Sequence, residues 1–408
     1  MRHDGSMTRT VADACPGVLR PHRAADGALV RLRLPGGGTT AAALAALTAA
    51  ALDHADGAIQ LTSRGNLQLR GLTVDPAGEV APALTAAVTA AGFLPSATHE
   101  RVRNIIASPM TGRRGGLADL RPTVAELDRL LCDNPALANL PGRFLFLLDD
   151  GSGDVVGLRG DLGLMATGSE SGRLIVGDLL GPDLALAEAP KALIALAESF
   201  LAVAGSCWQV RELPLQGREL VPGLVESARG IAVDGLPLGV LSQADGRRLI
   251  SMSLPFGSLT PAQVAAICVV AGAGSGTLVV TPWRGVIVPD LPLDRVAEAE
   301  RTLREVGVIL DEDSAWAGIT ACTGSPGCAK AAADVRTLTE QAVAGVAARP
   351  PLGRQVPLHV VACERRCGSP SGPHIEVLAD DDGLTATWAG RSWRVDTIEA
   401  VFPSRTRK

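Results

Sequence analysis

The chain has 408 residues, of which 47% are hydrophobic and 20% charged, and a formal net charge of −5. This length allows two or three domains with buried cores. The charge gives no overall attraction to nucleic acid or to anionic membranes, but it leaves room for a local basic pocket. No apolar run reaches the roughly 18 residues of a membrane-spanning helix, and residues 1–17 lack the apolar core of a signal peptide. We therefore predict a cytoplasmic protein without a membrane or nucleic-acid partner, whose eight cysteines serve metal binding or packing and not disulfides.

The first part of the chain has a hydrophobic pattern that predicts alternating strands and helices. We expect residues 1–20 to form a loose tail that docks through Cys15-Pro16-Gly17. Polar and apolar residues alternate over 28–35, which predicts a strand. The elements expected next are a helix over 39–55, a pair of strands within 58–74 and a helix over 81–92.

The segment 246–290 repeats this first pattern. Its LPF (254–256) corresponds to LPG (34–36) at an offset of 220 residues, and its TPWRG (281–285) corresponds to TSRG (62–65) with one inserted residue. Two unrelated strand–helix–strand segments are the alternative, because alanine-rich helices look alike. The matched positions favour an internal duplication.

Each repeat is followed by a longer segment of mixed character. The first is expected to hold an arginine-rich loop (101–114), a helix (122–133), a strand (143–150) and a helix (183–204). The second is expected to hold a helix (292–306), a helix after Cys328, a strand leading to Cys363 and further strands at 374–379 and 384–394. The order repeat, domain, repeat, domain predicts an α+β protein.

Four cysteines stand near the end of the chain in two short loops. Cys322 and Cys328 are spaced C-x5-C, and Cys363 and Cys367 are spaced C-x3-C. Four thiolates from two loops suit an iron–sulfur cluster, and the glycines and prolines of the loops let backbone amides approach the sulfides. Zinc fits less well because its knuckles have shorter first spacers; inert thiols are the third possibility. The other cysteines, interpreted as packing residues, are Cys15, Cys132, Cys207 and Cys268.

A polar pattern runs through LTSRGNLQLRG (61–71). Arg64, Asn66, Gln68 and Arg70 are spaced two apart, so on a strand they would share one face. By residue type alone, a solvated sheet face is the simpler interpretation.

Seven motifs of the chain resemble motifs of one known family. They occur in the same order as in that family and extend over nearly the whole chain. They are CPG (15–17), ADGALVRLRLPGG (25–37), LTSRGNLQLRGL (61–72), ERVRNIIASP (100–109), NLPGRF (139–144), TACTGSPGCAKA (320–331) and HVVACERRCGSP (359–370). The chain resembles the nitrite/sulfite reductase superfamily, and within it the precorrin-3B synthase family of aerobic cobalamin biosynthesis. The cysteine quartet and the TSRGNLQLRG block are the most specific of these motifs.

The resemblance implies a sulfite-reductase-like fold. Two ferredoxin-like half-repeats form one pseudo-symmetric domain, and two further α+β domains serve cofactor and substrate. The expected boundaries are a tail (1–20), the first half-repeat (21–80), the first α+β domain (81–240), the second half-repeat (241–300) and the cluster-binding domain (301–408).

The resemblance also implies the residues of the site. It implies that a [4Fe–4S] cluster is bound by Cys322, Cys328, Cys363 and Cys367. It also implies that the polar residues of 61–71 form an anion-binding site and not a solvated sheet face. The residues expected to bind the substrate's carboxylates are Arg64, Asn66, Gln68, Arg101, Arg103 and Arg143.

Two departures separate this chain from the siroheme reductases. Those enzymes carry two lysines, one residue apart, after a Leu-Pro pair; here these positions hold Arg143 and Leu145. The family's second cysteine loop is close to G-C-x-K-G-C, whereas this chain has Arg365 and Arg366 before Cys367. The loss of both lysines disfavours a reductase that must deliver several protons.

The implied reaction is the O2-dependent oxidation of precorrin-3A to precorrin-3B, with hydroxylation at C20 and lactone formation. Its partners would be precorrin-3A, O2 and an electron donor, with electrons from NAD(P)H directly or through a reductase protein. The family also implies a mononuclear non-haem iron, whose ligands and catalytic residues the sequence does not identify. His99-Glu100 and His359 lie within motifs, but a lone histidine is more often a packed or surface residue. The alternatives are a siroheme-dependent ferredoxin sulfite or nitrite reductase, and a non-catalytic tetrapyrrole carrier or zinc-stabilised binding protein.

Overall fold

The structure is a computed structural model that describes residues 13–226, 235–346, 356–370 and 372–405. The chain divides into two units, each described by itself below. Unit 1 comprises residues up to Gly17, Arg33–Gly36 and Leu94–Ala232, and unit 2 comprises Val18–Leu32, Gly37–Phe93 and Val233–Lys408. No helix among the described residues has both the length and the apolar character needed to cross a bilayer.

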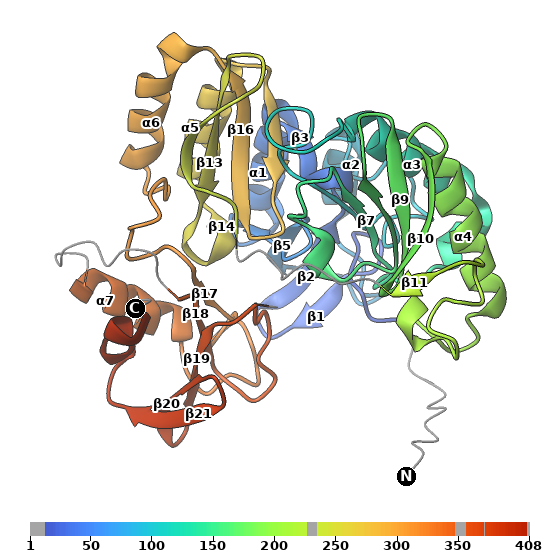
Figure 1. The fold of residues 1–408 in the computed structure, drawn as a ribbon. Helices are drawn as coiled ribbons and strands as arrows, with labels where there is room; N and C mark the ends of the chain where they lie inside the picture. The colour runs from blue at the N-terminus through green and yellow to red at the C-terminus, as the bar shows by residue number, and fades with distance from the viewer. Residues whose placement is uncertain (1–12, 227–234, 347–355, 371, 406–408) are drawn as a thin grey trace. The chain divides into compact units, whose positions relative to one another are not determined.

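Unit 2 contains two similar sheets, one built mainly from each repeat (Figure 1). The first has the order β1-β2-β5-β4-β14, with β1 (His22–Ala24), β2 (Gly27–Leu32), β4 (Ile59–Leu61), β5 (Leu67–Leu72) and β14 (Ser258–Leu259). The second has the order β12-β13-β16-β15-β3, with β12 (Gly239–Ser242), β13 (Arg248–Ser253), β15 (Thr277–Val280), β16 (Gly285–Leu291) and β3 (Gly38–Thr40).

The two sheets exchange their edge strands. β3 comes from the first repeat but pairs with β15 of the second, with Thr40 opposite Thr277. β14 comes from the second repeat but pairs with β4 of the first, with Leu259 opposite Ile59. Each repeat therefore completes the other's sheet, which is the arrangement that an internal duplication predicts for two halves of one domain.

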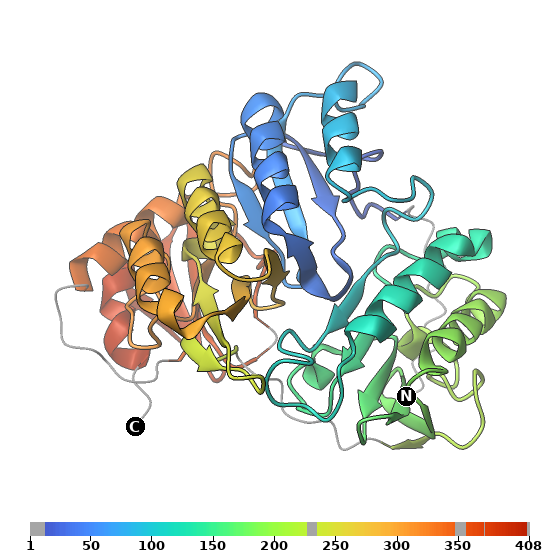
Figure 2. The ribbon, with the colours of Figure 1, turned by 90° about the horizontal axis from the view of Figure 1, so that it is seen from above.

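The repeats also begin their helices in the same way. Thr40 caps α1 (Ala41–His54) by accepting a hydrogen bond from the amide of Ala43 at 3.1 Å. Thr260 caps α5 (Pro261–Gly272) in a capping box with Gln263. α1 and α5 pack side by side, as the view from above shows (Figure 2). The other helices of these repeats are α2 (Pro82–Ala90) and α6 (Val296–Glu305).

The last part of unit 2 is a five-stranded sheet with the order β17-β18-β19-β20-β21. These strands are β17 (Ile319–Ala321), β18 (Leu358–Val361), β19 (Ile375–Asp380), β20 (Gly383–Trp388) and β21 (Arg391–Val395). β17, β18 and β19 run parallel, and α7 (Val335–Val346) contributes to the core beside them. Arg405 ties this core together because its guanidinium donates to the carbonyls of Val356 and Ala315.

Unit 1 is built on a six-stranded sheet with the order β11-β10-β9-β8-β7-β6. Its strands are β6 (Ile105–Ala107), β7 (Phe146–Asp149), β8 (Leu162–Ala166), β9 (Ser171–Val176), β10 (Leu179–Ala185) and β11 (Val225–Glu226). The sheet shares one core with α3 (Arg121–Asp133) and α4 (Ala189–Val203), in which the ring of Phe144 contacts those of Phe146 and Phe200. The expected helix over 183–204 begins later because its first residues continue β10.

A buried acidic turn follows β7 and makes the stability of unit 1 depend on pH. Asp149 accepts hydrogen bonds from the amides of Gly151 and Gly153, and Asp154 accepts one from Ser108 Oγ at 2.6 Å. Burial, reinforced by the charges of Asp149 and Asp150, raises the pKa of Asp154 to about 6. Between about pH 4 and pH 6 the folded state then binds more protons than the unfolded state, so stability falls as the pH rises through this window.

We expect Asp154→Asn to stabilise unit 1 at pH 7.5, by up to about 2–3 kcal/mol, because it removes a buried charge and keeps an acceptor for Ser108. The gain should shrink at pH 4.5, where the carboxyl is already protonated in the folded state. Unfolding curves at the two pH values measure this. Asp183→Asn, which breaks an exposed ion pair with Arg173, is the control and should bring no gain at pH 7.5. An equal gain from Asp154→Asn at both pH values would contradict the assignment.

Candidate active site

Parallel strands bring the two cysteine loops together. Cys322 directly follows β17 and Cys363 lies two residues beyond the end of β18, and the carboxyl ends of these paired strands lie at the same edge of the sheet. The Cys322 amide donates to the carbonyl of Val360 at 2.9 Å, and the Ala332 amide donates to the carbonyl of Ala362 at 3.1 Å. The first loop therefore folds back along the second.

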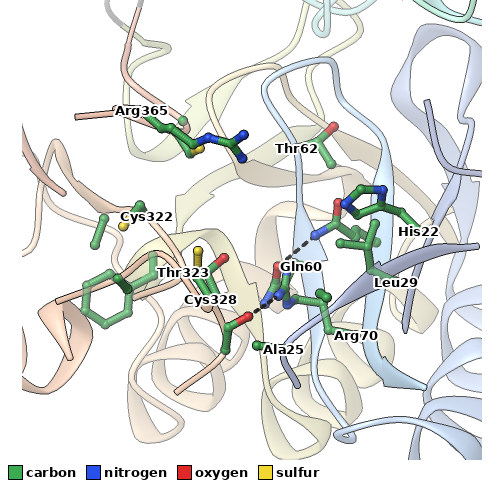
Figure 3. Close-up of a pocket in the computed structure, with 18 of the residues that line it drawn as sticks. His22, Ala25, Leu29, Gln60, Thr62, Arg70, Cys322, Thr323, Cys328 and Arg365 are labelled. Atoms are coloured by element: carbon green, nitrogen blue, oxygen red, sulfur yellow. Dashed lines mark hydrogen bonds between the residues drawn. The ribbon is translucent and has the colours of Figure 1, made fainter. Parts of the chain in front are cut away.

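All four cysteines line one cavity of about 730 Å³ within unit 2. None of them forms a disulfide. In Figure 3 the sulfur atoms of Cys322 and Cys328 lie on one side of the cavity, and His22, Gln60 and Arg70 lie across from them. The expected convergence of the four thiols is thus present in the structure.

The surroundings of Cys322 suit an iron–sulfur cluster. Burial raises the pKa of its thiol, while the backbone amides of Ala362 and Gly324 donate to the sulfur and act in the opposite direction. Such amides stabilise cluster sulfur. Within the described residues, no group of three or more His, Cys, Asp or Glu side chains is arranged to hold a single metal ion. The cysteines of a [4Fe–4S] cluster each bind a different iron, so their sulfurs lie farther apart than those around a zinc ion.

The remaining wall of the cavity is strongly basic. The basic side chains that line it are Arg23, Arg31, Arg70, Arg284, Lys330, Arg336 and Arg365, together with His22. Among the described residues that line the cavity, none is acidic. A site with this charge favours a ligand with several negative groups.

Two of the predicted polar residues do not lie on the strand. β5 begins at Leu67, so Arg64 and Asn66 belong to the turn between β4 and β5, and the prediction that they share a strand face with Gln68 and Arg70 is wrong. Gly65 is the reason: its φ of +65° turns the chain before the strand starts. Gln68 does line the cavity, where it accepts from Arg31 at 3.0 Å and donates to Gln60 at 3.1 Å.

The corresponding turn of the second repeat contains Arg284. Thr62 bonds to the carbonyl of residue 66 and Thr281 bonds to the carbonyl of residue 285, so the two turns have the same length. The predicted one-residue insertion is therefore wrong. Arg284, with a φ of 58°, matches Gly65 and not Arg64. A non-glycine residue in this conformation is strained and points to a functional constraint.

Arg336, at the start of α7, is a further basic residue that the motifs did not indicate. Its guanidinium lies 5.6 Å from the centre of the Phe256 ring, and its Nε is buried without a hydrogen-bond partner. Burial and the nearby charge of Arg70 lower the pKa of Arg336. A half-buried cation with an unpaired buried Nε can bind an anionic group of a ligand.

The second cysteine loop departs from the family pattern at Arg365 and Arg366, and the structure places these two side chains differently. Arg365 lines the cavity. Arg366 has a φ of 48°, and its Nε pairs with Glu376 at 3.1 Å. The loop therefore keeps a left-handed residue at the position where the family has glycine, and it adds one basic side chain to the cavity.

The other predicted arginines belong to unit 1. Arg103 makes a two-pronged ion pair with Asp128, both bonds at 2.7 Å, and Arg101 donates to Asp13 at 3.3 Å. Arg143 is exposed and lies 5.4 Å from the centre of the Trp208 ring. Their part in substrate binding stays a prediction.

The two histidines within motifs are engaged in structural hydrogen bonds. His99 Nε2 bonds to the carbonyl of Asn134, and its Nδ1 bonds to Thr98 and Ser96. His359 bonds to Thr320 Oγ1 at 2.8 Å and to the carbonyl of Cys367 at 3.2 Å. Both rings thus have the packed role that the sequence favoured.

Sequence reasoning missed most of the basic wall. Arg284 carried a signal, because it stands in the repeated turn. Arg365 was visible as a departure from the family pattern. Arg31 and Lys330 lie within two of the family motifs but were not singled out there, and Arg336 lies outside every motif.

Comparison with known proteins defines the class of this fold. The nitrite/sulfite reductase ferredoxin-like half domain matches residues 20–87 and again residues 241–306. The chain thus carries two copies of this half domain, which confirms the predicted duplication and the α+β fold. The solved structure of Mycobacterium tuberculosis NirA has the same fold, with a TM-score of 0.71 at 17% identity over 90% of this chain and 77% of that one.

Two curated proteins are similar in sequence to this chain over most of its length. The chain is 26% identical over 392 residues to a precorrin-3B synthase of Sinorhizobium sp, covering 93% of this chain and 83% of that protein. It is 24% identical over 387 residues to the chloroplastic ferredoxin–nitrite reductase of Zea mays, covering 83% of this chain and 67% of that protein. These matches confirm the resemblance to the nitrite/sulfite reductase superfamily and, within it, to precorrin-3B synthase.

Proposed function

We propose that this chain is an iron–sulfur oxidoreductase that oxidises an anionic tetrapyrrole, and that it converts precorrin-3A into precorrin-3B. One observation carries this proposal: four cysteines and seven Arg or Lys side chains line the same cavity, and no described lining residue is acidic. The precorrin-3B synthase of Sinorhizobium sp is the relative that supports the particular reaction.

The charge of the cavity supports an anionic tetrapyrrole as the substrate class, and its volume is compatible with one. Early corrin precursors carry many acetate and propionate groups, and arginine binds carboxylates in a two-pronged manner that lysine cannot. The cavity volume of about 730 Å³ lies in the upper part of the range for small-molecule sites, about 300–1,000 Å³. Each charge-assisted hydrogen bond contributes about 1.5–3 kcal/mol, so several of them hold a polyanion despite the negative net charge of the chain.

The reaction balances with O2 and one two-electron donor. One oxygen atom enters the macrocycle and the other leaves as water, which consumes two electrons and two protons, supplied by a reduced pyridine nucleotide directly or through a partner protein. Cys322, Cys328, Cys363 and Cys367 would hold a [4Fe–4S] cluster, which passes electrons one at a time. The basic wall would bind the carboxylates of the macrocycle and orient it toward the cysteine loops.

A siroheme-dependent sulfite or nitrite reductase is the second candidate, supported by the relative in Zea mays. The side chains at the two lysine positions of those reductases argue against it. Leu145 is 4% exposed and apolar, so it delivers no proton, and Arg143 stacks on Trp208. A reduction that needs several protons loses roughly 10²–10⁴-fold for each positioned acid that is missing.

The absorption spectrum of anaerobically purified protein distinguishes the two candidates. We expect a broad iron–sulfur shoulder without haem bands, together with conversion of precorrin-3A when air and a reductant are supplied. Intense siroheme bands would support the reductase. A protein without iron, sulfide or turnover would instead be a tetrapyrrole carrier or a zinc-stabilised binding protein.

A further inference from the structure

Two arginines, one from each repeat, bind the backbone of the two cysteine loops. Arg70 on β5 donates from Nη2 to the carbonyl of Gly327 at 2.9 Å, and Gly327 directly precedes Cys328. Arg284, in the turn before β16, donates from Nη2 to the carbonyl of Gly368 at 3.0 Å, and Gly368 directly follows Cys367. Figure 3 shows Arg70 on the wall of the cavity opposite Cys322. Each half-repeat thus holds one cysteine loop at the residue next to a cysteine.

The structure fixes Arg70 by means of a carboxylate. Its Nε and Nη2 donate to the two oxygens of Asp26, both at 2.9 Å, and its side chain is only 8% exposed. Gly327 leaves room for this pair, because a Cβ there would come within 3.1 Å of Asp26 Oδ2. Since Asp26 neutralises its charge, Arg70 acts on the first loop mainly as a rigid hydrogen-bond donor.

Arg284 is fixed in a different way. Its φ of 58° places it in the left-handed region, and Gly257 leaves room for it, because a Cβ there would lie 2.6 Å from Arg284 Cβ. Burial lowers the pKa of Arg284. No carboxylate of the described residues lies within ion-pair distance of its guanidinium, so the second loop is held by a donor that keeps its charge.

We propose that Arg70 and Arg284 are positioning residues for the cluster, and that Arg284 in addition raises its reduction potential. The proposal rests on the proposed function to the extent that the four cysteines hold a cluster. Reduction adds a negative charge to a cluster, so a positive charge held beside it favours the reduced form. A hydrogen bond to the loop backbone keeps the cysteine beside it in place while this charge changes.

Arg284→Gly is the main test variant. Glycine is the residue that the first repeat has at the same turn position, with the same sign of φ, so the change relieves strain and should leave the fold intact. We expect a lower midpoint potential in an EPR-monitored redox titration, and loss of the cluster to an iron chelator about tenfold faster than in wild type. Arg284→Lys, which keeps the charge, should retain most of the potential but not the resistance to the chelator.

The paired variant Asp26→Asn with Arg70→Gln separates the two effects, because it removes the hydrogen bond to Gly327 without changing the net charge. We expect faster loss of the cluster with an unchanged potential. Arg301→Gln, an exposed change on α6, is the control and should alter neither quantity. If the wild type contains the cluster but Arg284→Gly leaves both the midpoint potential and the rate of cluster loss to the chelator unchanged, this proposal is wrong and the proposed function still stands. A wild type without iron and sulfide overturns the proposed function and this proposal with it.

Discussion

We expect Cys322→Ser to abolish the iron–sulfur absorption and the tetrapyrrole oxidation that we propose for this chain. This is the largest effect that we expect from a single substitution, because serine does not replace a thiolate as a cluster ligand and Cys322 is the half-buried proposed ligand that follows β17. Iron and sulfide content per chain, measured after anaerobic purification, gives the readout.

Cys207→Ser is the matched control for this substitution. The Cys207 thiol donates to the carbonyl of Glu212 at 3.3 Å in unit 1, and a serine hydroxyl retains that bond. Its iron content and activity should equal those of the wild type. Full iron and sulfide content in Cys322→Ser would refute the ligand assignment. Equal losses of iron and sulfide in both variants would also count against it, because they would show that any cysteine substitution impairs cluster incorporation.

Arg336→Gln weakens the binding of an anionic tetrapyrrole by about 10–150-fold, which corresponds to one charge-assisted hydrogen bond of about 1.5–3 kcal/mol. The expected effect is large because Arg336 is half-buried beside the Phe256 ring and its buried Nε has no hydrogen-bond partner. Burial lowers the pKa of its guanidinium, so a ligand carboxylate would relieve an unfavourable state. Titration of the protein with a porphyrin octacarboxylate, followed by fluorescence, measures the affinity.

Two further variants make this prediction specific. Arg336→Lys keeps the charge but not the two-pronged geometry, so its affinity should lie between those of the wild type and Arg336→Gln. Arg301→Gln removes one exposed positive charge from α6 and should leave the affinity unchanged. If Arg336→Gln and Arg301→Gln weaken binding equally, the effect is one of total charge, and Arg336 has no special place in the site.

The sequence by itself determined the duplication, most helices and strands, and the meeting of the two cysteine pairs. These features depend on local signals: the alternation of polar and apolar residues along β2, the matched LP and Thr–Arg–Gly positions of the two repeats, and the spacing of the cysteines. The resemblance to a known family implied the cluster and the macrocycle as ligands, and it implied an anion-binding role for the polar block over 61–71.

Only the tertiary structure decided which basic residues share the cavity with the cysteines. The turns before β5 and β16 are set by backbone hydrogen bonds and by positive φ at Gly65 and Arg284, and polar–apolar alternation does not reveal either. The exchange of β3 and β14 between the two sheets likewise follows from long-range pairing, which a local pattern does not encode. The basic wall joins segments as far apart as Arg23 and Arg365, because a cavity is lined by whatever the packing of distant strands and helices brings together.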